Sequence, residues 1–349
     1  MPTGPSVLIP SSWRPEGQLA AQQLPAALAD LRASLEAQNL TPVHVRIYAT
    51  PTAGDAAAAG VRDLFAPATP AVSVVTTTPC AGGEIAGVHV LSTASKQVVP
   101  IVDGGHTVGV RIDVSPPMVV LAGLTSPTDD DAASEFAALF DRAERLLGAH
   151  GLSFTDVART WLHLPHLLRD YDDLNVARSA FFALRGIGRA TAPPASTGIQ
   201  GGALDSSRMQ MDLVATSPDA FHPLVANLQC EAWEYGSAFS RGMTLRDIVT
   251  VSGTASIDAD GHTIHLDDAA DQIRATWSTV RELLASEQVS LPPKGPQAWV
   301  LYFKNPTVWQ AWRSLVAAGE VEEPAEAVCV YADVCRDNLL FEMELTAAR

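Results

Sequence analysis

Hydrophobic and polar positions repeat one order of secondary structure along the chain. In the last third, alternation predicts strands over residues 230–242 and 247–257, and apolar residues at helical spacing predict a helix over 267–289. A strand, a shorter helix and two more strands follow, over 298–304, 306–319, 327–334 and 339–347. The predicted order of this third is therefore β-β-α-β-α-β-β.

The other two thirds repeat this order. In the middle third, the corresponding strands and helices are predicted over 106–114, 117–126, 131–152, 156–164, 173–187, 195–201 and 208–216. The first of these helices has capping residues at both ends, Asp129 to Asp131 at its start and Gly148 and Gly151 at its end. The first third lacks an evident opening strand, and the rest of its pattern is predicted over 6–12, 24–40, 43–50, 54–66, 71–78 and 87–95.

Three modules of one kind predict an α+β fold. We expect a degenerate first module over 1–100, a second module over 101–220 and a third over 221–349, with soft boundaries near 96–104 and 218–226. The alternation of strands and helices in each module predicts a sheet with two helices covering one face. The uncovered faces of three such sheets can bury each other as a pseudo-trimer within one chain, so we expect a monomer.

Composition narrows the range of partners. The 349 residues include 39 acidic and 23 basic ones, and the formal net charge of −16 opposes nonspecific binding to nucleic acid or to anionic membranes. An anionic substrate therefore needs a local cluster of arginine or lysine. The first residues lack the pattern of a secretory signal, and no apolar run approaches the roughly 20 residues that span a bilayer. We expect a cytoplasmic protein.

The sequence favours neither a metal nor a cofactor. None of the four cysteines forms a Cys-x-x-Cys pair, which argues against a disulfide framework and against a structural zinc site. The pairs His163/His166 and His262/His265 have a spacing that occurs in metal sites, but neither pair has a third ligand nearby in the sequence. The nucleotide-binding GxGxxG and Walker patterns and the GxSxG pattern of serine hydrolases are absent from the sequence.

Four stretches carry a family resemblance. The segments GLSFTDVARTWLHLPHLLRDYDDLNVARSAFF (151–182), PASTGIQG (194–201) and SGTASI (252–257) resemble the YjgF/RidA superfamily, whose small members are homotrimers with sites at subunit interfaces. The most specific segment, ADVCRDNLLFEMEL (332–345), is similar to the chorismatases, a fused form of this superfamily. Chorismatases convert chorismate to pyruvate and either a cyclohexadiene diol or a hydroxybenzoate.

The resemblance implies a single acid. In an alignment on LLFEMEL, the Glu that RidA-type enzymes carry in the last strand falls on Glu342, whereas their substrate-binding Arg falls on Glu326 or Ala327. An imine deaminase that uses this Arg is therefore not expected. In the other two modules the Glu position falls on Gln210 and near Gly87, so the resemblance implies one working site, at the junction of the middle and last modules.

Period-two alternation puts Glu342 and Glu344 on one face of their strand, opposite Phe341 and Met343. Taken alone, the pattern favours two solvent-facing side chains, because carboxylates are rarely buried without a partner. The family resemblance implies instead a partly buried Glu342 that acts as a general acid. Loss of water would raise the pKa of its carboxyl, which would protonate the methylene of the enolpyruvyl ether of chorismate.

Cys335 lies seven residues before this acid. A lone cysteine is more often a small buried hydrophobe than a reactive group. In chorismatases, however, Cys at this position goes with the hydroxybenzoate-forming branch and Ala with the hydrolytic branch, so the resemblance implies that Cys335 directs the reaction to 3-hydroxybenzoate. Ala255 departs from this pattern, because the same branch is associated with a smaller Gly near that loop.

The two carboxylates of chorismate suit the forked guanidinium groups of arginines. Arg178 and Arg241 rank first, because they lie in stretches that match ligand-contacting segments of the superfamily, although any one of these cations alone is more often at the surface. The remaining candidates are Arg159, Arg336 and Lys304 for the carboxylates, Gly253 for close backbone approach, Thr197 and Gln210 for hydrogen bonds, and His163 and Tyr235 for ring contacts.

Three functions stay open on the sequence. The first choice is a cofactor-free chorismatase that forms 3-hydroxybenzoate and pyruvate, which family analogy links to secondary metabolism. The second is a chorismate hydrolase that forms 3,4-dihydroxycyclohexa-1,5-diene carboxylate and pyruvate. The third is a non-catalytic RidA-like protein that binds small metabolites, a reading favoured by the loss of the family Arg.

Overall fold

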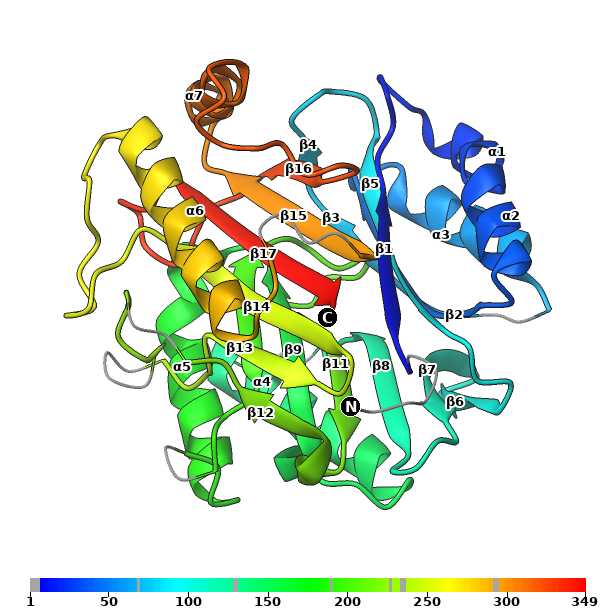
Figure 1. Ribbon diagram of the computed structural model, residues 1–349. Helices are drawn as coiled ribbons and strands as arrows, with labels where there is room; N and C mark the ends of the chain where they lie inside the picture. Colours follow the sequence, from blue (N-terminus) through cyan, green and yellow to red (C-terminus); the bar gives the residue numbers. More distant parts are fainter. Residues whose placement is uncertain are drawn as a thin grey trace.

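The computed structural model describes residues 7–67, 70–127, 131–188, 191–225, 228–232, 237–290 and 295–349. The strands form three sheets, and the helices lie around them on the outside of the molecule (Figure 1). Short 3-10 turns occur at Ala21–Gln23, Phe154–Asp156 and Pro218–Ala220. The arrangement is the predicted α+β class, with one sheet for each module.

The first sheet has the strand order β1-β5-β2-β3. Its strands are β1 (Ile9–Trp13), β2 (Thr41–Ala49), β3 (Ala71–Thr76) and β5 (Ile85–Thr93), and its helices are α1 (Leu24–Ala27), α2 (Ala29–Ala37) and α3 (Gly54–Phe65). β2 and β3 are parallel, because α3 connects them, whereas β5 runs antiparallel to both β1 and β2. The predicted absence of an opening strand concerns the residues before β1, of which the structure describes only Val7 and Leu8.

The middle sheet has the order β10-β9-β11-β8-β7-β6. Its strands are β6 (Val98–Asp103), β7 (His106–Ile112), β8 (Met118–Leu124), β9 (Val157–Leu164), β10 (Ala195–Gln200) and β11 (Gln210–Thr216), and its helices are α4 (Ala132–Gly148) and α5 (Leu167–Ala183). β6 was not predicted and forms a hairpin with β7. The side chain of Asp131 caps α4 by accepting the Ser134 N–H, whereas Asp129 lies outside the described residues.

The last sheet has the order β12-β13-β14-β17-β15-β16-β4. Its strands are β12 (Phe221–Pro223), β13 (Gly242–Leu245), β14 (Ile248–Ala255), β15 (Gln297–Phe303), β16 (Val328–Tyr331) and β17 (Phe341–Ala348), and its helices are α6 (Ala269–Ser286) and α7 (Pro306–Ala317). At its edge, β4 (Thr78–Pro79) of the first module pairs with β16. The first and last modules are therefore joined along a strand edge.

The predicted strand over 230–242 is wrong for the residues that the structure describes there. The opening strand of the last module, β13, begins at Gly242, and 237–241 hold one isolated bridge residue, Ser240. The guanidinium of Arg241 donates two hydrogen bonds to the Cys230 carbonyl, 11 positions away in the chain, whereas one extended strand would hold these two residues far apart.

The sheet faces that the helices leave uncovered bury each other at the centre of the molecule. One buried cluster takes Val43 and Leu91 from the first sheet, Trp161 from the middle sheet, and Met243 and Ile248 from the last. A second cluster also contains strand residues of all three sheets. The pseudo-trimer predicted from the repeated pattern is confirmed. None of the helices in the described ranges combines the length and the apolar character needed to cross a membrane.

Candidate active site

The last strand, β17, carries two buried acids. Phe341 and Met343 pack into the hydrophobic core below α6 and α7. Glu342 and Glu344 point to the opposite face, toward the other two modules, and are only 4% and 2% exposed. The predicted alternation is therefore confirmed, and the solvent-facing interpretation of the two acids is wrong.

Strand register relates Glu342 to the other modules. Glu342 lies opposite Tyr302 of the strand that follows the first long helix of its module. Gln210 and Gly87 occupy the same register position in the middle and first sheets. A carboxyl group is thus present at one of three corresponding positions.

Glu342 lies in the wall of a cavity between the middle and last modules. The middle module lines it from α5 and β10 with Tyr171, Arg178, Ser196 and Gly198, and the last module with Phe239, Arg241, Gly253, Ala255, Ile257, Cys335 and Glu342. The cavity has a volume of about 20 Å³, which is room for one water. Its walls must separate before a ring-sized molecule can enter.

Two buried arginines line the cavity from opposite modules. Arg178 on α5 donates to the Asn175 side chain over 2.6 Å, and Arg241 holds the Cys230 carbonyl with Nε and Nη2 at 2.9 and 2.7 Å. Their guanidinium carbons lie 5.7 and 5.6 Å from the centre of the Phe239 ring. Two cations that face one small cavity make it suitable for an anionic molecule.

The environment of Glu342 favours its protonated form. Burial raises the pKa of its carboxyl to about 8, and the nearby Glu344 carboxylate acts in the same direction. Arg241 and Arg159 oppose this shift and do not cancel it. A carboxyl that keeps its proton at neutral pH can act as a general acid.

Cys335 lies in the same wall and is also protonated. Burial raises the pKa of its thiol to about 12, and the neighbouring Glu342 adds to the shift. A thiol that stays protonated at neutral pH is a weak donor and a polarizable contact rather than a nucleophile.

Gly253 gives Glu342 its space. A Cβ atom at this position would lie 2.1 Å from Glu342 Oε1 and 3.1 Å from the Thr197 methyl carbon. The Gly253 N–H donates to Thr197 Oγ1 over 2.9 Å. Close backbone approach therefore fixes the position of the acid against the middle module.

Glu344 anchors a buried hydrogen-bond network behind Glu342. One of its carboxylate oxygens accepts from Arg159 Nη2 at 2.7 Å and from the Thr197 hydroxyl, and the other accepts from the Tyr302 hydroxyl at 3.1 Å. Arg159 Nη2 also contacts Thr197 Oγ1 at 2.6 Å. Arg159 and Thr197 thus connect the two modules through Glu344, and neither side chain lines the cavity.

The junction of the first and middle modules repeats this network. Asp212 Oδ2 accepts from Arg46 Nε at 2.6 Å and from Ser73 at 2.9 Å, His44 lies 3.4 Å from it, and Oδ1 accepts the Gly123 N–H. Burial tends to raise the pKa of Asp212, but Arg46 and then His44 hold it well below its ordinary value. A buried acid paired with an arginine therefore occurs at both junctions, as Glu344 and as Asp212. Two residues before this acid, the last module has the protonated Glu342, whereas the middle module has Gln210.

The other sequence candidates lie away from the cavity. His163 is buried near Tyr48 at the junction of the first and middle modules, where burial, followed by the charge of Arg46, lowers its pKa to about 3. Gln210 is opposite it in the sheet, and its side-chain Nε2 has no partner in the described structure. Arg336 donates to the Gly261 carbonyl and Lys304 to Asp337, and Tyr235 lies outside the described residues.

The sequence did not single out several residues of the site. Tyr171 and Phe239, which line the cavity, have no pattern that distinguishes them from core aromatics. Glu344 had a usable signal, because it shares a strand face with Glu342.

On an exposed turn that does not line this cavity, Asp258, Asp260 and His262 bring ligand atoms within 4.8 Å of one another, but Asp258 already accepts the backbone N–H groups of the other two.

The fold and this junction define a class of molecule in which three α+β modules close into a pseudo-trimer with a site between two of them. No family model matches the sequence, and no curated protein matches it. Among solved structures, the chain is similar to a chorismatase, with a TM-score of 0.65, 16% identity, and 99% of each chain covered. The chain therefore has the fold of that protein over its whole length.

Smaller proteins match single parts of the chain. The YjgF gene product of E. coli covers 35% of this chain with 95% of its own, at 19% identity and a TM-score of 0.28. Yeast Mmf1 covers 37% of this chain with 98% of its own, at 20% identity and a TM-score of 0.31.

Proposed function

We propose that the chain is a chorismatase. The observation that carries the proposal is the buried Glu342, protonated at neutral pH, in one cavity with Arg178 and Arg241. The whole-chain likeness to a chorismatase supports the same assignment. Chorismate has two carboxylates for the guanidinium groups and an enolpyruvyl ether for the acid.

Glu342 begins the reaction. Its carboxyl transfers a proton to the methylene carbon of the enolpyruvyl group, and the adjacent ether carbon becomes an oxocarbenium-like electrophile. The Glu342 carboxylate that remains stabilises this positive charge. Arg178 and Arg241 hold the substrate carboxylates, so that the methylene carbon stays against the acid.

The proposed product is 3-hydroxybenzoate, released with pyruvate. The ring hydroxyl on C4 attacks the activated carbon, and the bond from that carbon to the C3 oxygen breaks, so that this oxygen takes up the hydroxyl proton and stays on the ring. The C4–O bond then breaks, the former hydroxyl oxygen leaves as the carbonyl oxygen of pyruvate, and the ring loses its C3 proton to Glu342 and becomes aromatic. The two products together contain the atoms of chorismate, so no net water is consumed. The Cys335 thiol in the cavity wall supports this route, because a polarizable side chain beside the ring can assist rearrangement of the ring intermediate.

A chorismate hydrolase is the second candidate. The observation that favours it is Ala255, whose side chain is part of the cavity wall where the hydroxybenzoate-forming branch is associated with Gly. In this reaction, water attacks the activated carbon, and the ring leaves as the dihydroxycyclohexadiene carboxylate with pyruvate. This route takes up one water for each chorismate.

Product identification separates the two candidates. Purified protein is incubated with chorismate, and the ring products are resolved by chromatography against authentic 3-hydroxybenzoate and the diene diol. We expect 3-hydroxybenzoate from the wild-type chain and a larger share of diol from Cys335→Ala. The diol as the main wild-type product would establish the hydrolase instead, and an unchanged product ratio in Cys335→Ala would remove the thiol from the mechanism.

A further inference from the structure

A second cavity lies between the last and first modules. α7 and the approach to β16 line one side of it, with Trp309, Arg313 and Ala327, and Arg14 after β1 and Ile85 of β5 line the other. The candidate active site is built from the same kinds of element, namely α5 and β10 of one module and β14 and β17 of the next. The two cavities therefore occupy corresponding junctions of the pseudo-trimer.

This second cavity cannot repeat the acid chemistry. Gly87 stands at the register position of Glu342, and a Cβ atom there would lie 2.6 Å from the Trp13 carbonyl oxygen and 2.7 Å from Val328 Cγ2. No side chain fits, so no carboxyl can be placed at this position. Glu342 therefore has no counterpart in this cavity at the corresponding strand position.

The size and one wall of the second cavity fit a small organic ligand. Its volume is about 560 Å³, against about 20 Å³ for the candidate active site, and small-molecule sites measure roughly 300–1,000 Å³. The Trp309 ring supplies an aromatic surface, and apolar side chains continue it, including Pro79, Ile85 and Ala325.

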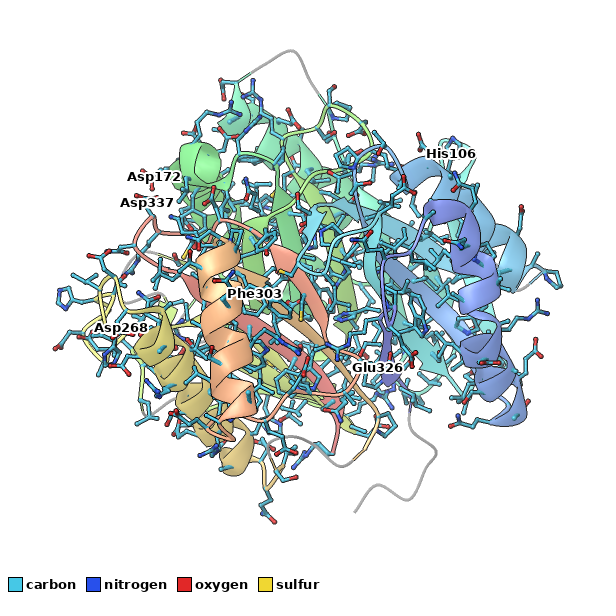
Figure 2. All side chains as sticks on the ribbon, turned by 90° about the horizontal axis from the view of Figure 1, so that it is seen from above. His106, Asp172, Asp268, Phe303, Glu326 and Asp337 are labelled. Atoms are coloured by element: carbon cyan, nitrogen blue, oxygen red, sulfur yellow. The ribbon has the colours of Figure 1, made fainter. Side chains whose placement is uncertain are left out.

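The charged groups of the cavity have both signs. Arg14 Nη1 pairs with Glu323 Oε1 at 2.9 Å, and Arg313 Nη1 lies 3.4 Å from the same carboxylate, which neutralises part of their charge. Glu326, between α7 and the first module (Figure 2), accepts the Arg14 backbone N–H at 2.9 Å, and it lines the cavity together with Glu16.

This mixture of charges selects against simple ions. A ligand with a carboxylate alone meets the glutamates, and a ligand with an ammonium alone meets the guanidinium groups. A zwitterion pairs with both.

We propose that this cavity binds a small zwitterion, an α-amino acid with an apolar or aromatic side chain. Its carboxylate pairs with Arg14 and Arg313. Its ammonium group pairs with the carboxylate of Glu326, and its side chain lies against Trp309. The inference does not depend on chorismate conversion.

Calorimetric titration of the full chain tests the ligand class with three probes. L-phenylalanine has both charges, 3-phenylpropanoate lacks the ammonium group, and phenethylamine lacks the carboxylate. We expect L-phenylalanine to bind at least tenfold more tightly than either of the others. Equal affinities for the three, or no heat with L-phenylalanine at millimolar concentration, would overturn the proposal.

Two variants locate the binding. We expect Arg14→Gln to weaken L-phenylalanine binding at least tenfold, and the matched change Arg178→Gln in the other cavity to leave the affinity within twofold. Trp309→Leu should also weaken it, and Arg313→Gln replaces Arg14→Gln if that variant melts early. Loss of binding in Arg178→Gln with retention in Arg14→Gln would place the amino acid in the wrong cavity and refute the inference.

Discussion

At the scale of single residues, the raised pKa of the buried Glu342 makes the folding stability depend on pH. Its folded pKa of about 8 lies above the ordinary value of 4.5, so the folded chain holds a proton that the unfolded chain releases between these two values. The stability that this proton contributes is therefore present in full below about pH 4.5. It is lost as pH rises toward 8, by about 1.4 kcal/mol per pH unit at most.

Glu342→Gln removes this titration. We expect the variant to gain stability relative to wild type as pH rises from 5 to 8, measured as the difference in free energy of unfolding by urea. A difference that stays constant with pH would show that Glu342 has an ordinary pKa.

In the proposed reaction, Glu344 acts through the pKa of Glu342. Glu344→Gln removes a negative charge that raises the pKa of Glu342 and leaves Arg159 to lower it. The acid then loses its proton at lower pH, so we expect the alkaline fall of kcat/KM for chorismate to move to lower pH. The measurement is the pH profile of wild type and variant.

Asp212→Asn provides the matched control for Glu344→Gln. Asp212 is buried in the corresponding network at the other junction, so both changes should cost stability by roughly 3–5 kcal/mol. We expect Asp212→Asn to leave the pH profile in place. If both variants shift it equally, or neither does, Glu344 has no particular influence on the acid.

At the scale of elements, the seam between β14, β10 and β17 positions the acid. We expect Gly253→Ala to reduce kcat at least tenfold, because its Cβ would displace the Glu342 carboxylate. Gly198→Ala is the control in the same cavity, since its Cβ would meet only Tyr171 at an ordinary 3.6 Å. Steady-state kinetics of the two variants decides the point, and equal kcat values would contradict the positioning by close approach.

The sequence correctly predicted strands in which the alternation of apolar and polar residues comes from burying one face in the core. The alternation in β17 placed Glu342 and Glu344 correctly, because one face of that strand packs on α6 and α7. The same kind of alternation gave a wrong prediction of a strand over 230–242. There the Arg241 side chain, and not a neighbouring strand, bonds the backbone carbonyl of Cys230. Local periodicity reports which side chains are buried and does not report what buries them.

Local patterns in the sequence did not predict the contacts between modules. Arg159 was expected at the substrate, but it forms an ion pair with Glu344, 185 positions away in the chain. Thr197 takes part in the same network. A buried acid and a buried arginine compensate each other only after the sheets have come together, so no spacing in the sequence identifies the pair.

At the scale of the whole molecule, three sheets of one chain cover faces that separate subunits would otherwise cover. Residues such as Val43, Trp161 and Met243 meet in one cluster although each comes from a different sheet. We therefore expect a monomer in analytical ultracentrifugation at micromolar concentration. A stable trimer at that concentration would contradict the expectation that the chain closes on itself.

The repeated scaffold also bears on the proposal of a single reactive junction. Three corresponding strand positions hold Gly87, Gln210 and Glu342, and the proposed chemistry requires the carboxyl of the last. The three junctions thus share the same strand framework, while the side chains at this position differ.

Pyruvate release from chorismate shows whether the chain is a chorismatase and whether Glu342 is its acid. Wild-type protein and Glu342→Gln are compared at pH 7 with a coupled pyruvate assay, after circular dichroism has shown that both are folded. We expect turnover by the wild type and a loss of at least a hundredfold in the variant, because general acid catalysis contributes roughly 10²–10⁴-fold. No pyruvate from the wild type would rule out a chorismatase, and full activity in Glu342→Gln would rule out Glu342 as its acid.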